Sequence, residues 1–258
     1  MIQKITACFW LMSLIALLAQ SPSLMAQRLH TSNSNGWYMY MGNHPINDKW
    51  GIHLEAQLRR NDIVSDGQQL LLRGGINYYL SKQTTATAGY CFVETYPYGE
   101  FAAKSSFPEH RIWEQLQYKS QLGRVECVNR LRLEQRFVHS PTMQSDSTYA
   151  AGDAVYSNRF RVLNRFSIPF KGKTIEDKSF YLSFYDELFV NFGKKVAMNI
   201  FDQNRAYAAI GYKIPKVGRL ELGYMLQTVV KGDGIKIEDN HTLQVGLMAN
   251  IPFSKPKK

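Results

Sequence analysis

The sequence predicts an all-β fold: an antiparallel up-and-down transmembrane β-barrel of about ten strands that follows a cleaved signal peptide. The first observation is a recurring period of two, in which charged and apolar side chains alternate along segments of about ten residues. The second is the length of these segments, because strands of soluble sheets usually have about 5–6 residues. The third is the alternation of short and long links between the segments.

Residues 1–26 have the composition of a secretory signal peptide. Lys4 precedes an apolar run from Ile5 to Leu18, and small residues follow as far as Ala26. A single membrane anchor is the alternative, but the run is shorter than the roughly 20 residues that a spanning helix needs. We therefore expect export, cleavage before Gln27 and residence in the cell outer membrane.

The stretch Val128–Phe137 shows the alternation most clearly. One side of an extended chain would carry Arg130, Arg132, Glu134 and Arg136, and the other side would carry leucine and phenylalanine. A helix would scatter the same residues around its axis. An unpaired buried charge costs several kcal/mol, so the arginine row needs either water or carboxylate partners.

The same period defines strands along the whole chain. We expect them at residues 48–60, 67–80, 83–94, 109–119, 123–137, 155–169, 178–190, 203–214, 217–229 and 241–253. Residues 27–47 form a separate N-terminal segment in this interpretation, residues 48–253 form the barrel, and residues 254–258 form a basic tail. Within the N-terminal segment, Trp37–Met41 would be a rim or plug segment, or would belong to a barrel of twelve strands.

The links between strands predict which ends lie together. The short links are Ser81–Lys82, Ser120–Leu122 and Pro215–Lys216, and they alternate with the long links Thr95–Pro108, Val138–Ala154, Asn191–Asp202 and Val230–Asn240. Outer-membrane barrels place short turns in the periplasm and long loops outside the cell. With the last strand ending in the periplasm at Phe253, ten strands would leave the N-terminus in the periplasm as well.

The charged face of each strand should point into the lumen. The interior of a barrel of about eight to ten strands is just wide enough for side chains, so the charges should pair into a ladder that fills it. The excess of arginine over carboxylate leaves a second possibility, a narrow pore that favours anions. Arg59, Glu109 and Trp113 lie on the same inward rows. The predicted charge network of the lumen comprises Glu55, Arg73, Arg111, Arg130, Arg132, Glu134, Arg136, Arg159, Arg161, Arg165, Glu187, Arg205 and Glu221.

Several motifs resemble those of a known family. They are W-Y-x-Y-x-G from Trp37, K-W-G-I-H-L-E-x-Q-L-R from Lys49, P-E-H-R-I-W-E-Q from Pro108, N-R-L-R-L-E-Q-R-F from Asn129 and F-D-Q-N-R-x-Y from Phe201. As a set they resemble an uncharacterised family of outer-membrane β-barrels from Bacteroidetes-type Gram-negative bacteria, which is classified as a domain of unknown function. The resemblance implies a barrel and implies no activity, substrate or catalytic residue.

Signals for other chemistry are weak. The chain has no G-x-S-x-G motif, its six histidines show no metal-ligand spacing, and its cysteines form no C-x-x-C pair. Cys91 and Cys127 fall on opposite faces of their strands, which argues against a disulfide between them. His139–Ser140 and the His53-x-Glu55 pair are the only candidates for a hydrolase site. We therefore expect no enzymatic activity, no metal and no cofactor.

Three functions remain open on the sequence. The first is a structural barrel or a narrow anion-favouring pore, whose partners would be outer-membrane lipid, lipopolysaccharide, the barrel-assembly machinery and a small anionic solute. The second is an outer-membrane enzyme that modifies lipid or lipopolysaccharide. The third is a soluble periplasmic barrel whose dry, ligand-binding lumen is filled by the apolar rows, with the arginine rows outside. The formal net charge of +10 fits an anionic partner, but export argues against nucleic acid.

Overall fold

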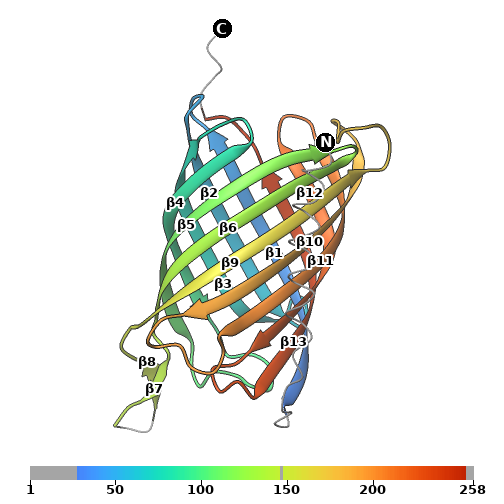
Figure 1. Ribbon diagram of the computed structural model, residues 1–258. Helices are drawn as coiled ribbons and strands as arrows, with labels where there is room; N and C mark the ends of the chain where they lie inside the picture. Colours follow the sequence, from blue (N-terminus) through green and yellow to red (C-terminus); the bar gives the residue numbers. More distant parts are fainter. Residues whose placement is uncertain (1–27, 146–147, 254–258) are drawn as a thin grey trace.

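The computed structural model describes residues 28–145 and 148–253, and these residues form a closed β-barrel with a small hairpin attached (Figure 1). The signal peptide and the basic tail expected from the sequence lie outside the described residues. No helix in the described part is long and apolar enough to cross a membrane. The strands are β1 (Leu29–Pro45), β2 (Trp50–Asn61), β3 (Asp66–Tyr79), β4 (Thr84–Thr95), β5 (Phe107–Leu122), β6 (Val125–Val138), β7 (Pro141–Met143), β8 (Tyr149–Ala151), β9 (Val155–Pro169), β10 (Phe180–Phe192), β11 (Phe201–Ile214), β12 (Gly218–Val230) and β13 (Lys236–Ala249).

The wall has eleven strands, in the order β1-β13-β12-β11-β10-β9-β6-β5-β4-β3-β2. The expected number, ten or twelve, was therefore wrong by one strand. An odd number of strands cannot close with antiparallel pairs alone, and the closing pair, β1 with β13, is parallel. All other neighbours in the wall pair antiparallel, and β7 and β8 form a separate two-stranded sheet within the long link after β6.

The additional strand comes from the N-terminal segment that the sequence had set apart. β1 pairs with β13 from Leu29 to Gly42 and with β2 from Asn35 to Pro45. Trp37–Met41 is thus the middle of a wall strand, not a rim segment or a plug. The first half of β1 reads L-H-T-S-N-S-N, which has little strand propensity, so its extended conformation depends on pairing with a strand about two hundred residues away.

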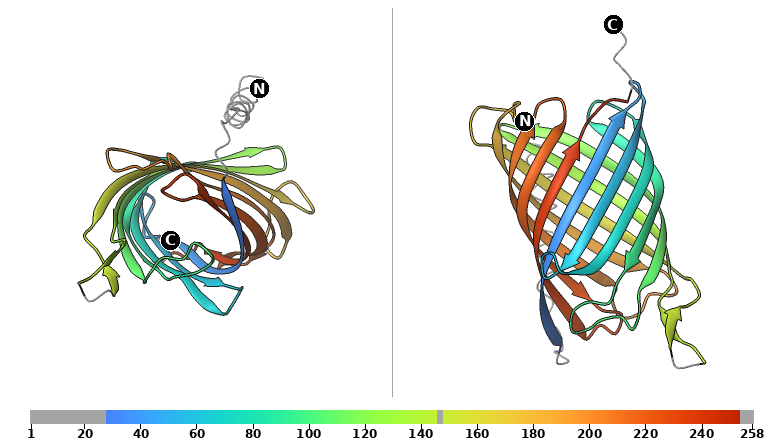
Figure 2. Two further views of the ribbon diagram at one scale, coloured as in Figure 1. Left: turned by 90° about the horizontal axis from the view of Figure 1, so that it is seen from below. Right: turned by 180° about the vertical axis from the view of Figure 1, so that it is seen from behind.

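The short links and the long links named from the sequence lie at opposite ends of the barrel, although the long link after β9 (residues 170–179) lies with the short ones and the short link after β2 (residues 62–65) lies with the long ones. The links that follow β2, β4, β6, β10 and β12 lie at one end, called here the loop end, and those that follow β1, β3, β5, β9 and β11 lie at the turn end. Because β1 runs parallel to β13, Leu29 lies at the loop end and Ala249 at the turn end (Figure 2, right). The expectation that both ends of the chain lie on one side was wrong, since it counted an even number of strands.

The two faces of the wall differ sharply in chemistry. Arginine, glutamate and glutamine side chains point inward and are buried, whereas large apolar side chains point outward and are exposed. The inverted arrangement, in which the leucine rows fill a dry lumen, is therefore wrong. The exposed outward side chains include Leu54, Leu58, Leu72, Ile76, Ile112, Leu116, Leu131, Phe160, Leu182, Phe184, Val190, Ile210, Leu222 and Leu243.

A row of polar side chains interrupts the apolar outer face on four adjacent strands. Asn129 donates to Asn164 over 2.7 Å between β6 and β9, and Asn204 donates to Asp186 over 2.9 Å between β10 and β11. Asn164 and Asp186 stand opposite each other in the β9–β10 register. Cross-strand hydrogen bonds thus satisfy much of the polarity of this row within the wall itself.

Candidate functional site

The lumen contains a connected network of arginines and carboxylates, and Glu134 on β6 lies at its centre. Glu134 is fully buried, with Arg159 Nη2 2.6 Å from its Oε2 and Arg161 Nη1 2.7 Å from its Oε1. The first contact follows from strand register, because Glu134 stands directly opposite Arg159 on β9. Further arginine nitrogens lie 3.6 to 4.0 Å from the same Oε1, and they belong to Arg73, Arg111 and Arg132.

Glu187 on β10 is the second node of the network. Its Oε1 lies 2.6 Å from Arg130 Nη2 and 2.7 Å from Arg161 Nη2. Arg161 therefore bridges the two central carboxylates, Glu134 and Glu187, and links β6, β9 and β10. Bridging of this kind offsets the cost of desolvating these charges, because each of the two central carboxylates meets at least two guanidinium groups.

The remaining carboxylates continue the network toward both ends. Glu109 accepts hydrogen bonds from Arg111 and Arg136 over 2.5 to 3.0 Å. Arg73 Nη1 lies 2.5 Å from Glu55. Arg165 pairs with Glu221, which also accepts hydrogen bonds from the hydroxyls of Tyr181 and Tyr207 at 2.8 and 3.2 Å.

The structure places every residue of the predicted charge network on the inner face, but not every arginine has a close carboxylate. Arg132 bonds to Gln115 Oε1 at 2.7 and 3.1 Å and stacks over Trp113 at 4.8 Å. Arg205 bonds to Gln203 at 3.1 Å. The alternation along one strand predicts which side chains point inward. It does not predict which side chains from different strands meet across the lumen.

Sequence reasoning missed two buried carboxylates of the lumen. Asp202 was assigned to a loop, yet its Oδ2 lies 2.8 Å from Arg159 Nη1 inside the barrel. The register of β10 and β11 shifts between Phe189 and Val190, and this bulge turns both Asp202 and Gln203 inward. Glu238 on β13 was the second omission, and it pairs with Lys231 at 2.7 Å near the loop end.

The candidate hydrolase residues occupy other environments. His53 lies inside the charge network, with Nε2 3.4 Å from Glu55 and Nδ1 3.0 Å from Asn43 Oδ1. His139, in the long link after β6, contacts the carbonyl oxygen of Gly152 through Nδ1 at 2.8 Å. Within the described residues, no group of three or more His, Cys, Asp or Glu side chains is placed to hold a metal ion. Cys91 is buried inside the barrel and Cys127 belongs to the outward row of β6, so the thiols point to different sides of the wall.

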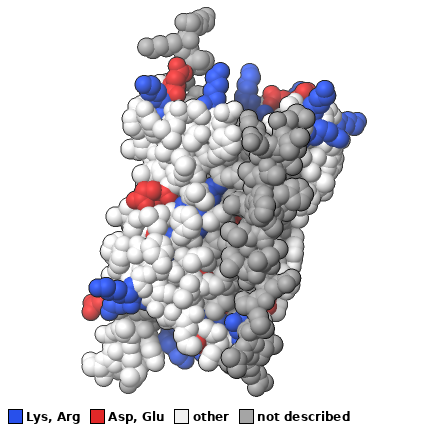
Figure 3. Space-filling view, viewed as in Figure 1, with Lys and Arg blue, Asp and Glu red and all other residues white. Residues whose placement is uncertain are grey.

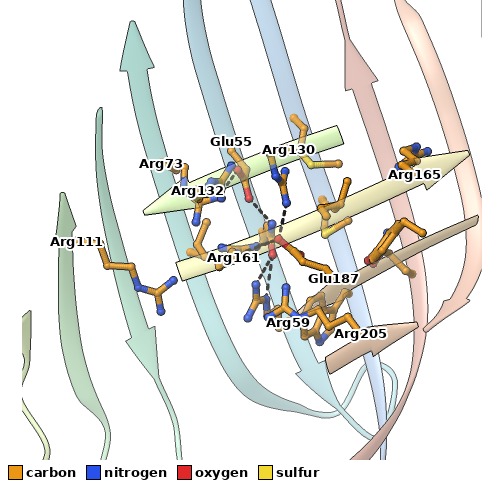
Figure 4. A pocket seen from close by; sticks show the side chains of 18 residues that line it. Glu55, Arg59, Arg73, Arg111, Arg130, Arg132, Arg161, Arg165, Glu187 and Arg205 are labelled. Carbon is orange, nitrogen blue, oxygen red and sulfur yellow. Dashed lines mark hydrogen bonds and ion pairs between the residues drawn. The ribbon is translucent and has the colours of Figure 1, made fainter. Parts of the chain in front are cut away.

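A cavity of about 90 Å³ remains among these side chains near the middle of the lumen. It is lined by eight arginines and only two carboxylates, with three aromatic or aliphatic side chains from β1 completing one wall (Figure 4). The charged lining residues are Glu55, Arg59, Arg73, Arg111, Arg130, Arg132, Arg161, Arg165, Glu187 and Arg205. The rest of the interior at this level is filled by fully buried side chains such as Trp113, Phe189 and Met225.

The loop between β4 and β5 extends over one side of the mouth of the barrel at the loop end (Figure 2, left). The hydroxyl of Tyr98 in this loop donates to Glu238 Oε2 over 3.2 Å, although β1, β2 and β3 separate β4 from β13 in the wall. Lys236 Nζ lies 5.6 Å from the ring of Phe101 in the same loop. Burial and the neighbouring Glu238 carboxylate raise the pKa of the Tyr98 hydroxyl, so it remains a donor at neutral pH.

Residues 34–238 match the family described as "Protein of unknown function (DUF2490)". No curated protein matches the chain. A solved structure of the NanC porin, in a rhombohedral crystal form, aligns with 78% of this chain and 89% of its own at 10% identity and a TM-score of 0.43. Since the family match spans most of the chain, the protein is a member of the DUF2490 family.

Proposed function

We propose that this protein is an outer-membrane β-barrel whose lumen is a closed, anion-favouring charge network. The observation that carries the proposal is the opposite chemistry of the two faces of the wall. A soluble barrel would have to hydrate an outer surface made largely of leucine, isoleucine and phenylalanine. A lipid bilayer accepts that surface and leaves the polar side chains to the lumen.

The distribution of charge and aromatic residues along the barrel supports the membrane location. Most Lys, Arg, Asp and Glu groups on the visible surface lie toward the two ends, and uncharged surface predominates between them (Figure 3). Outward aromatic pairs flank the band at the turn end, where Trp50 packs on Tyr78 at 4.7 Å and Phe180 packs on Tyr212 at 4.9 Å. Amphipathic aromatic rings favour the interface between lipid and water.

The interior supports a narrow or closed barrel over an open pore. The charge ladder crosses the lumen, a central cavity within it measures about 90 Å³, and the β4–β5 loop lies over one side of the loop end. A water molecule occupies roughly 30 Å³ in the liquid, so the cavity has room for about three waters or one small ion. The excess of arginine in its lining favours anions over cations. We assign no reaction to the barrel, because His53 and the central carboxylates are engaged in the charge network.

Cell fractionation tests the location. The mature protein is expected in the outer-membrane fraction, soluble only in detergent, and its electrophoretic mobility should change on heating as the barrel unfolds. Recovery from the periplasm without detergent would contradict the proposal. A variant of the protein without residues 1–26 provides the matched control, because it should remain in the cytoplasm.

A further inference from the structure

Two arginines of the central cavity lack a carboxylate and share one aromatic ring. Arg59 Cζ lies 3.8 Å and Arg205 Cζ 4.9 Å from the ring centroid of Trp37. Both side chains are more than nine-tenths buried. Within the described part of the chain, neither guanidinium has a carboxylate oxygen within 4.0 Å, although the other cavity arginines except Arg132 have one much closer.

Neutral amides hold these two guanidinium groups in place without cancelling their charge. Arg59 donates to Gln57 Oε1 at 2.6 and 2.9 Å and to Gln69 Oε1 at 2.5 Å. Arg205 donates through Nε to Gln203 Oε1 at 3.1 Å, and its two terminal nitrogens make no hydrogen bond to any described residue. The Arg205 terminal nitrogens are thus donors without an acceptor in a cavity that both arginines line (Figure 4).

Two neighbouring positive charges in a poorly hydrated interior repel each other, and a protein does not normally bury them without compensation. An anion would supply that compensation. Guanidinium groups present planar pairs of N–H donors that match an oxoanion bearing several oxygens better than a single-atom halide. The cavity volume of about 90 Å³ admits a small inorganic oxoanion.

We propose that Arg59, Arg205 and Trp37 form a binding site for a small tetrahedral oxoanion of the phosphate class. This inference rests on the anion-favouring lumen of the proposed function and names the ligand that the lumen holds. The terminal nitrogens of Arg205 bind the oxoanion directly, Arg59 supplies the second positive charge, and Trp37 fixes the spacing of the two guanidinium groups. Trp37 is itself fixed, since its Nε1 donates to Gln68 over 2.8 Å.

The test is thermal unfolding of the purified full-length mature barrel in detergent, titrated with inorganic phosphate at constant ionic strength. Sulfate serves as a second tetrahedral oxoanion and chloride as the reference. Phosphate and sulfate should raise the unfolding temperature saturably, and chloride should not. Arg59→Gln and Arg205→Gln should each weaken phosphate binding about ten-fold or more, because Arg205→Gln removes the hydrogen-bonding guanidinium and Arg59→Gln removes the second positive charge. Arg219→Gln is the matched control, since Arg219 faces the lumen near the turn end and already pairs with Glu126 at 2.7 Å.

A second readout separates binding from a structural role. Without phosphate, Arg59→Gln and Arg205→Gln should unfold at the same temperature as the parent or higher, because each removes an uncompensated charge. If either arginine had only a structural role, its replacement would lower the unfolding temperature. Absence of any phosphate effect on the parent protein beyond that of chloride would overturn the inference, as would equal phosphate responses in the parent and both variants. These measurements use purified protein, so a lack of phosphate binding would leave the outer-membrane location untouched. Likewise, recovery of the protein outside the outer membrane would leave a measured phosphate affinity unchanged.

Discussion

Replacing Glu134 with glutamine tests the charge network at its centre. The change keeps the shape of the side chain and removes a charge that five arginines approach within 4.0 Å. Removing one partner of a buried ion pair costs about 3–5 kcal/mol. Arg159 retains Asp202 at 2.8 Å and Arg161 retains Glu187 at 2.7 Å, so the expected loss is at the lower end, about 3 kcal/mol of unfolding free energy.

Denaturant titration of the barrel in lipid vesicles measures this loss. Glu126→Gln is the control, because the Glu126–Arg219 pair is about a quarter exposed at the turn end and should contribute no more than about 1 kcal/mol. The reasoning would be refuted if Glu134→Gln changed the unfolding free energy no more than Glu126→Gln does. That result would mean that water or ions screen the centre of the lumen as effectively as they screen its rim.

Three further predictions address the wall. Leu131 lies mid-strand on the outward face, so Leu131→Arg should cost about 2–4 kcal/mol in a bilayer while Leu131→Phe stays near neutral; denaturant titration would contradict this if the two were equal. In a background without the native cysteines, Gly232→Cys and His30→Cys should both react with a membrane-impermeant maleimide on intact cells, whereas Lys216→Cys should not. If His30→Cys failed to react, as is expected of Lys216→Cys, the parallel pairing of β1 with β13 would be disproved. Deleting residues 29–45 should abolish the heat-modifiable form, and a folded ten-stranded product would show that β1 is dispensable.

The strands and their inward faces could be predicted because a period of two is a local property. The row Arg130, Arg132, Glu134 and Arg136 predicts a strand with one charged face wherever its neighbours lie, and the structure has that strand as β6. The family resemblance, drawn from motifs spread over the chain, is confirmed by the match to residues 34–238. The short and long links named from the sequence also lie at opposite ends, because successive links of an up-and-down wall alternate between its two ends.

Features that depend on distant pairing could not be predicted. The first half of β1 is rich in serine and asparagine, and only its pairing with β13 makes it a strand. Asp202 enters the lumen because of a bulge that breaks the alternation. The lack of a carboxylate beside Arg59 and Arg205 depends on which side chains meet across the barrel. Inward rows from each strand give the composition of the lumen but not these contacts.

Single-channel recording in planar bilayers tests the central claim, a lumen closed by an arginine-rich network, most directly. The purified barrel should conduct many-fold less than an open general porin reconstituted in the same bilayer. In a potassium chloride gradient, the reversal potential of any current should have the sign that indicates preference for chloride. A large, steady conductance would contradict the closed lumen, and a preference for potassium would contradict the role of the arginines.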